Sequence, residues 1–204
     1  MRDDQGVNGG QAAQDSEYVE LVAAHIIDDD WHGVYTRCKG WIGSGGGAGL
    51  VDPWLGYVAS GLMHGQPRTA IHAVDLALGN WLPRPLDRSV MHWVRSRVVR
   101  NYLNDPRTAL SDLAISSGNA PSWLRPCIAD DASRCEAEAA RSRKRKPSVA
   151  PAPAFAGSDF ASATLAARLL ELQPDGSQPL LWEAIRPLLD GGSTTTPQVA
   201  TDRA

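Results

Sequence analysis

Hydrophobic positions in residues 51–120 recur at helical spacing, and the whole pattern is repeated after 39 residues. Eight of the 30 positions in 51–80 are identical to their counterparts in 90–119, where average residue usage would give roughly two. The identical pairs are Val51 with Val90, Trp54 with Trp93, the block 67–70 (PRTA) with 106–109, and the pair 79–80 (GN) with 118–119. The repeat predicts two copies of one structural unit.

The first copy predicts two helices. Asp52 is placed to cap the first helix, with Pro53 at the first helical position, where its missing N–H costs nothing. Gly65 can supply the left-handed residue that ends this helix. The second helix starts at Pro67, carries apolar residues at i, i+4 and i+7, and stops at Gly79. Small residues on both helices predict a close approach of the two axes: Ala59, Gly61, Ala70, Ala73 and Ala77.

The second copy follows the same plan. Its first helix is expected to open at Asp87 or Ser89 and to end at Asn104. Asp105 and Pro106 open its second helix, which stops before Gly118. A hairpin this short cannot bury its apolar stripe alone, so we expect the units to stack on neighbours.

Weaker patterns flank the two copies. A third, degraded copy is expected before them, with one helix over 17–27 and another over about 28–40. Residues 130–145 are polar nearly all round and predict a capping helix whose outer face meets water. The C-terminal segment predicts a hairpin of two short amphipathic helices, which either docks on the open end of the stack or serves as a helical ligand for another protein.

These patterns together predict an all-α fold: a short α-solenoid of stacked antiparallel helical hairpins with disordered termini. The expected limits are a disordered tail (1–15), a helical-repeat domain (16–145, with units at about 16–50, 51–89 and 90–120 and a capping helix to 145), a Pro/Ala-rich linker (146–158), an amphipathic helical hairpin (159–190) and a disordered tail (191–204).

Composition narrows the setting of this domain. A hydrophobic fraction of 43% supplies a core, and a mean hydropathy of −0.27 is typical of a soluble protein. No apolar run approaches the roughly 18 to 20 residues that a membrane span requires, and the acidic N-terminus does not resemble a signal peptide, so a cytoplasmic location is expected. The net charge of −3 gives no general attraction to nucleic acid or to an anionic membrane. Cys38, Cys127 and Cys135 lack CxxC spacing and predict reduced, mostly buried thiols.

The second halves of both units resemble tetratricopeptide repeats. That family places a Gly, then an Ala five residues later, then a large apolar residue four on, then an Ala three beyond that. The matching positions are Gly65, Ala70, Val74 and Ala77 in the first unit, and Asn104, Ala109, Leu113 and Ser116 in the second. The unit here has 39 residues where the family uses about 34, and Asn104 and Ser116 depart from its pattern. The resemblance implies a groove, lined by the first helix of each unit, that holds a peptide or partner protein.

Side chains on the first helices are the expected contacts with such a partner. Arg88, His92 and Arg95 project from one helix face at i, i+4 and i+7. If that helix lines the inner surface, they form a cationic groove suited to an acidic peptide or a C-terminal carboxylate; otherwise they are a solvated helix face. The expected partner-binding residues are Trp54, His64, Arg88, His92, Trp93 and Arg95.

Other segments allow different chemistry. His25, Asp29 and His32 at i, i+4 and i+7 could bind zinc or iron, although an acidic cap for a helix starting near residue 31 explains the aspartates without a metal. The Gly-rich run 43–49 is interpreted as a loop, because the next helix begins too late for a dinucleotide-binding turn, and no cofactor is expected. The basic run 141–146 (RSRKRK) could contact nucleic-acid phosphates or be the solvated end of the capping helix.

No serine-histidine-acid or paired-carboxylate arrangement has diagnostic spacing, so the chain is not expected to be an enzyme. The sequence favours a non-enzymatic protein–protein interaction module that binds a peptide or partner protein in a helical groove. The first alternative is a metal-binding protein or metalloenzyme using His25, Asp29 and His32. The second is a nucleic-acid-associated adaptor using residues 141–146, although nucleic acid is not the favoured partner and no membrane partner is expected.

Overall fold

The computed structural model describes residues 17–26, 28–44, 47–142 and 181–191. In these ranges every regular element is a helix, which confirms the expectation of an all-helical protein. The predicted N-terminal tail (1–15), the linker (146–158), most of the C-terminal hairpin and the final tail lie outside the described residues.

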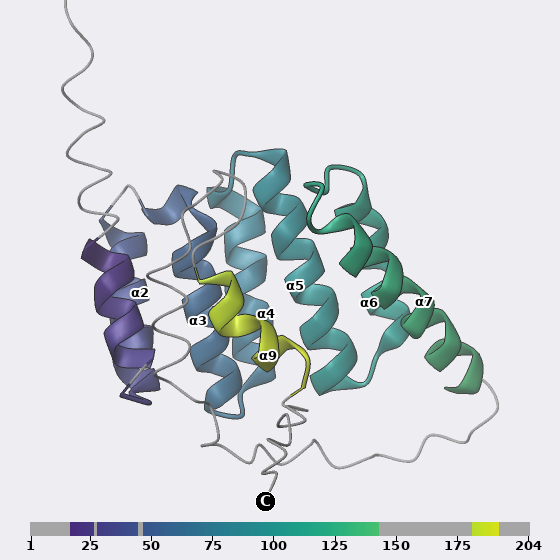
Figure 1. The fold of residues 1–204 in the computed structure, drawn as a ribbon, viewed down its shortest axis with the longest axis horizontal. Helices are drawn as coiled ribbons and strands as arrows, with labels where there is room; N and C mark the ends of the chain where they lie inside the picture. Colours follow the sequence, from purple (N-terminus) through teal and green to yellow (C-terminus); the bar gives the residue numbers. More distant parts are fainter. Residues whose placement is uncertain (1–16, 27, 45–46, 143–180, 192–204) are drawn as a thin grey trace, which may run out of the picture.

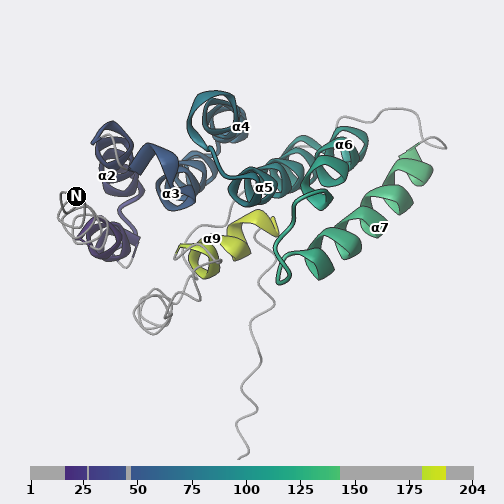
Figure 2. The same ribbon diagram turned by 90° about the horizontal axis from the view of Figure 1, so that it is seen from above.

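A run of consecutive helices makes up the body of the protein (Figure 1). After a helical segment over residues 17–26 come α2 (Trp31–Gly43), η1 (Gly47–Gly49), α3 (Val51–Met63), α4 (Pro67–Leu76), η2 (Ala77–Trp81), α5 (Pro85–Leu103), α6 (Pro106–Ser117), α7 (Arg125–Ser142) and α9 (Trp182–Leu189). From α2 to α7 each α-helix packs against the next one in the chain. We call α2 to α7 the row. Figure 2 shows α4 and α6 on one side of the row and α3 and α5 on the other, where α9 also lies.

Left-handed residues end two of the helices where the sequence predicts them. Gly65 has φ +66° after α3, and Asn104 has φ +54° after α5. The start of α6 is also confirmed: Asp105 accepts a hydrogen bond from the Thr108 backbone N–H at 3.1 Å, and Pro106 is the first helical residue. These features depend on the local chemistry of Gly, Asn, Asp and Pro, which is why the sequence alone identifies them.

Three other predicted boundaries are wrong. Helix α3 begins at Val51, with Leu50 as its capping residue, so Asp52 lies inside the first turn. Helix α5 begins at Pro85 instead of opening at Asp87 or Ser89. Beyond α4, the chain continues through a π-helical turn to Trp81, past the expected stop at Gly79.

The predicted close approach of α3 and α4 is confirmed. A Cβ added at Gly61 would lie 3.1 Å from the backbone nitrogen of Ala70. Ala70, Ala73 and Ala77 are fully buried. Small side chains on both helices therefore let the two backbones touch, as ridge-and-groove packing of helices requires.

Helix α7 differs from the polar capping helix expected over 130–145. It begins at Arg125, five residues earlier, and one of its faces is buried through Ile128, Asp131 and Cys135. This face packs against α6 and exchanges ion pairs with α5. No helix in the part of the chain that the structure describes is long and apolar enough to span a membrane.

Candidate functional site

Helix α9 packs against α3 and α5, although it is far from both in the sequence (Figures 1 and 2). Its apolar face is almost completely buried: Leu181, Ile185, Leu188 and Leu189 expose 1% or less of their surface, and Trp182 exposes 2%. The Trp182 ring packs between Trp93 of α5 and Trp123 of the turn before α7, with ring centroids 4.7 and 4.8 Å away. Aromatic clusters of this kind contribute beyond the area they bury.

Gly56 of α3 lies where α2 and the residue before α9 both approach α3. A Cβ added at Gly56 would lie 3.6 Å from Cδ1 of Leu181 and only 2.4 Å from Sγ of Cys38. A side chain at residue 56 would therefore collide with Cys38 of α2, whereas its Cβ would make only an ordinary contact with Leu181.

Backbone N–H and C=O groups at the two ends of α9 form hydrogen bonds with side chains of α3 and α5. The Leu181 N–H donates to Oδ1 of Asp52, in the first turn of α3, at 2.7 Å. At the other end, Nδ2 of Asn101 donates to the Leu189 carbonyl at 2.6 Å, and the Tyr102 hydroxyl donates to the Leu188 carbonyl. Helix termini leave such groups without partners inside the helix. Side chains of α3 and α5 therefore supply hydrogen bonds at both ends of α9.

Arg97 of α5 links the end of α9 to the ion pairs between α5 and α7. Its Nε lies 2.6 Å from Oδ2 of Asp131 on α7, and its Nη1 contacts the Asp190 carboxylate directly after α9. The guanidinium stacks on the Trp93 ring at 4.8 Å, and Trp93 Nε1 donates to Asp131 at 2.9 Å. Burial raises the pKa of Asp131, and the two arginines nearby, Arg97 and Arg100, oppose that shift.

Glu138 and Tyr102 lie next to these ion pairs. The Glu138 carboxylate accepts two hydrogen bonds from Arg100, which lower the pKa of Glu138 and raise that of Arg100. Burial raises the pKa of the Tyr102 hydroxyl, and the charge of Asp190 adds to the effect. Tyr102 therefore stays protonated and can donate to the α9 carbonyl at any physiological pH.

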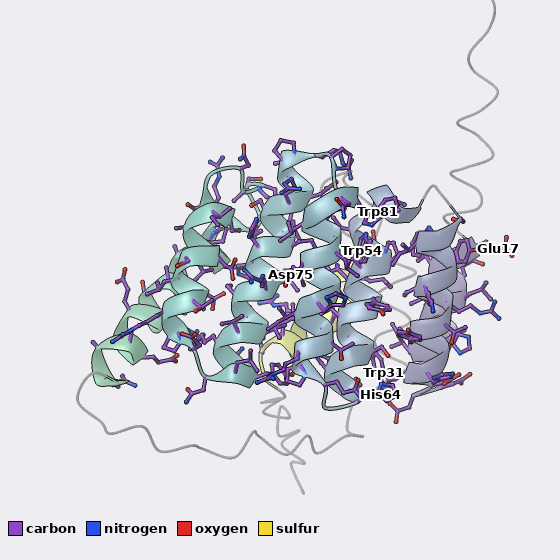
Figure 3. All side chains as sticks on the ribbon, turned by 180° about the vertical axis from the view of Figure 1, so that it is seen from behind. Glu17, Trp31, Trp54, His64, Asp75 and Trp81 are labelled. Carbon is purple, nitrogen blue, oxygen red and sulfur yellow. The ribbon has the colours of Figure 1, made fainter. Side chains whose placement is uncertain are left out.

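The six predicted partner-binding residues do not line one common surface in the structure. Trp54 is buried and its indole N–H donates to the Ala48 carbonyl at 3.0 Å, so it is not presented at a surface. His64 is exposed but lies at the C-terminal end of α3, and Figure 3 shows it far along that helix from Trp54. Trp93 is buried as well, and its ring packs against Trp182 of α9.

The three cationic residues predicted on α5 lie on a different side of that helix from its contacts with α9. Arg88 donates to the Leu78 carbonyl, His92 lies 3.2 Å from Asp112, and Arg95 pairs with both Asp75 and Asp112. These three residues do share one side of α5, as their spacing predicts, but that side packs against α4, η2 and α6. Their charges are used to hold the row together and do not form an open groove.

The contacts with α9 come from residues that the sequence analysis missed. Arg97 and Asn101 align with Val58 and Leu62 of the first copy, both of which are buried. A polar residue at a position that is apolar in the sister copy is a signal that could have identified this stripe. Asp52 carries the same signal, since its counterpart in the second copy is the buried, apolar Met91, whereas Gly56 aligns with Arg95 and carries none.

The predicted metal ligands do not come together. The first helical segment is described to residue 26 and α2 starts at Trp31, so His25 and His32 lie on different helices. His25 contacts Asp30 at 2.9 Å, while Asp29, with φ +55°, accepts from Trp31 Nε1 at 2.6 Å. Among the described residues, no three His, Cys, Asp or Glu side chains are placed to hold a metal ion. Most of the basic run 141–146 lies outside the described residues.

Comparisons with known protein families, with curated proteins and with solved structures found no significant match.

Proposed function

We propose that this protein is a non-enzymatic protein–protein interaction module, a short α-solenoid of stacked antiparallel hairpins whose α3–α5 side holds an amphipathic helix of a cytoplasmic partner protein. One observation carries the proposal: a helix from a distant part of the chain already lies on this side. It buries its apolar face there and both of its ends are hydrogen-bonded. Recognition of a helix by its apolar stripe is a common mode of peptide binding.

The resemblance to tetratricopeptide repeats agrees with this choice of surface. It implies a groove lined by the first helix of each unit, and α3 and α5 are those helices. The residues that would contact a partner are Asp52, Gly56, Trp93, Arg97, Asn101 and Tyr102.

A labelled peptide tests the proposal in the full-length chain. Trp182→Ala together with Ile185→Ala removes two buried anchors of α9, so the chain's own helix should leave the site. A fluorescent peptide of residues 180–191 should then bind this variant, and fluorescence anisotropy should give a dissociation constant at least about tenfold lower than for the unchanged chain.

The matched control is Arg186→Ala, which alters an exposed side chain of the same helix and should leave the site occupied. Far-ultraviolet circular dichroism checks that each variant is folded, and the single Trp182→Ala variant replaces the double one if it is not. A folded variant that does not bind the peptide would contradict the proposed function.

A further inference from the structure

Arg97 of α5 contacts two parts of the α9 site at once. Its guanidinium stacks on the Trp93 ring, 4.8 Å from the ring centroid, and its Nη1 contacts the Asp190 carboxylate. The Trp93 ring in turn packs against Trp182, the first residue of α9, with ring centroids 4.7 Å apart. One side chain of the row therefore binds the acid that follows α9 and supports the ring on which α9 begins.

A buried carboxylate fixes the position of Arg97. Its Nε lies 2.6 Å from Oδ2 of Asp131 on α7, whose side chain is 1% exposed. Trp93 Nε1 donates to the same oxygen at 2.9 Å. The guanidinium is planar and rigid, so with Nε held in this way the Nη1 donor faces one defined point at the end of α9.

The first copy of the repeat has an apolar residue at the position of Arg97. Arg97 aligns with Val58, which is fully buried. An arginine at a largely buried position needs acceptors for its donors. Asp131 is one such acceptor and belongs to the row, whereas Asp190 comes with the bound helix. With α9 in place Arg97 is only 11% exposed, so a helix without an acid at this point would take water from Nη1 and return no charged acceptor.

The charges beside Arg97 are otherwise balanced. Arg97 and Arg100 face Asp131 and Glu138, so two cations are matched by two carboxylates. An acid on a bound helix therefore gains from direct contact with the Nη1 donor, while an acid placed elsewhere on that helix gains little from this group of charges.

We propose that the α3–α5 side recognises its partner helix by an aromatic–acid pair: a tryptophan at the first helical position, which packs between Trp93 and Trp123, and an acidic residue eight positions later, which Arg97 binds. In α9 the pair is Trp182 and Asp190. Arg97 determines the specificity for the acid. This inference rests on the proposed function, since it names the kind of helix that the site holds.

Four peptides of residues 180–191 test the pair, each labelled at the N-terminus and amidated at the C-terminus so that no terminal carboxylate replaces the Asp190 side chain. The first has the natural sequence, LLWEAIRPLLDG. The second carries Asp190→Asn. The third carries Asp190→Asn and an extra aspartate after Gly191, which restores the net charge but moves the acid by two residues. The fourth carries Trp182→Leu.

Fluorescence anisotropy measures their binding to the full-length Trp182→Ala, Ile185→Ala variant. The Asp190→Asn peptide should bind at least about fivefold more weakly than the natural one, because a charge-assisted hydrogen bond becomes a neutral one. The peptide with the extra aspartate should be equally weak. Trp182→Leu should also weaken binding at least about fivefold, because it removes the ring contacts with Trp93 and Trp123.

A change in the chain tests the role of Arg97. Arg97→Gln together with Asp131→Asn removes the guanidinium without leaving a buried carboxylate unpaired. In this background the natural and Asp190→Asn peptides should bind within about twofold of each other, while Trp182→Leu still weakens binding. The control is Arg134→Gln, on the exposed side of α7, which should keep the full preference for the acid. Circular dichroism checks the fold, and the comparison of the four peptides does not depend on this variant.

Equal binding of the natural and Asp190→Asn peptides would overturn recognition of the acid and leave the proposed function standing. Recovery of binding by the extra aspartate would also overturn it, because net charge would then be enough. A preference for the acid that survives without Arg97 would overturn the role of that residue, and equal binding of the Trp182→Leu peptide would overturn the role of the tryptophan. If the natural peptide does not bind a folded variant, it is the proposed function that fails.

Discussion

Asp105 holds the start of α6 with one carboxylate, which accepts from the Thr108 hydroxyl at 2.7 Å and the Thr108 N–H at 3.1 Å. These hydrogen bonds lower the pKa of Asp105. Asp105→Ala should destabilise the protein by about 1 kcal/mol at pH 7. Because the folded-state pKa is depressed, the contribution is complete above the ordinary value of 3.8 and is lost as the pH falls below it.

Urea unfolding at pH 7 and pH 3 measures this difference for the Asp105→Ala variant. The control is Asp130→Ala, whose pair with Arg134 is more than half exposed on both sides and should contribute almost nothing. A destabilisation by Asp105→Ala that is the same at both pH values would show that the carboxylate charge is not what caps α6.

The three thiols should differ sharply in reactivity. Cys38 and Cys135 are fully buried, and burial raises the pKa of Cys135 to about 11 and that of Cys38 further. Cys127 is half-buried near the start of α7. Since the thiolate is the reactive form, an aromatic disulfide reagent at pH 8 should label one thiol quickly and the other two only on unfolding. Cys127→Ser should abolish the fast phase; a fast phase that survives in this variant would contradict the assignment.

At the scale of the element, two glycines in helices have opposite environments. A Cβ at Gly61 of α3 would lie 3.1 Å from the backbone nitrogen of Ala70, whereas a Cβ at Gly40 of α2 would meet no atom within 4 Å. Gly61→Ala should destabilise the protein by about 1 to 3 kcal/mol, because α4 must move away. Gly40→Ala should stabilise it by up to about 1 kcal/mol through helix propensity alone. Thermal unfolding of both variants measures these two effects. If Gly40→Ala also destabilised the protein, the difference in packing at the two glycines would not explain their effects on stability.

Helix ends show how far the sequence could predict the elements. The ends at Gly65 and Asn104 and the start at Asp105 were predicted because their chemistry involves neighbours in sequence. The predicted start of α3 is wrong: the helix begins at Val51, and the carboxylate of Asp52 accepts from the Leu181 N–H, 129 residues away. A residue that looks like a local cap can serve a distant helix end, and nothing in the local pattern distinguishes the two roles.

The same limit applies to the site. Helical spacing correctly placed Arg88, His92 and Arg95 on one side of α5, but it could not say which neighbour that side meets. Arg97 and Asn101, on another side, make the contacts with α9. Periodicity predicts which residues share a face, whereas the partner of each face depends on how the whole row packs.

At the scale of the whole molecule, Arg97 joins three elements, because it lies on α5 and pairs with Asp131 of α7 and with Asp190 after α9. Arg97→Met should cost about 3 kcal/mol, since it leaves the Asp131 carboxylate buried without its nearest cation. Arg100, at 3.5 Å from Asp131, supplies partial compensation. The loss should exceed that of Asp190→Asn, which removes a carboxylate that is 41% exposed.

The pH dependence of this loss identifies its cause. Burial already raises the pKa of Asp131, and removal of Arg97 should raise it further. A carboxyl group whose folded-state pKa is raised destabilises the protein most at a pH above that pKa, and the effect disappears as the pH falls and the group takes up a proton. Chemical unfolding at pH 7 and pH 4.5 should therefore show the cost of Arg97→Met shrinking, whereas Arg134→Met, on the exposed side of α7, should stay within about 0.5 kcal/mol at both. Adding Asp131→Asn to Arg97→Met should recover part of the stability at pH 7; if it adds a further full loss, the buried charge is not the source of the cost.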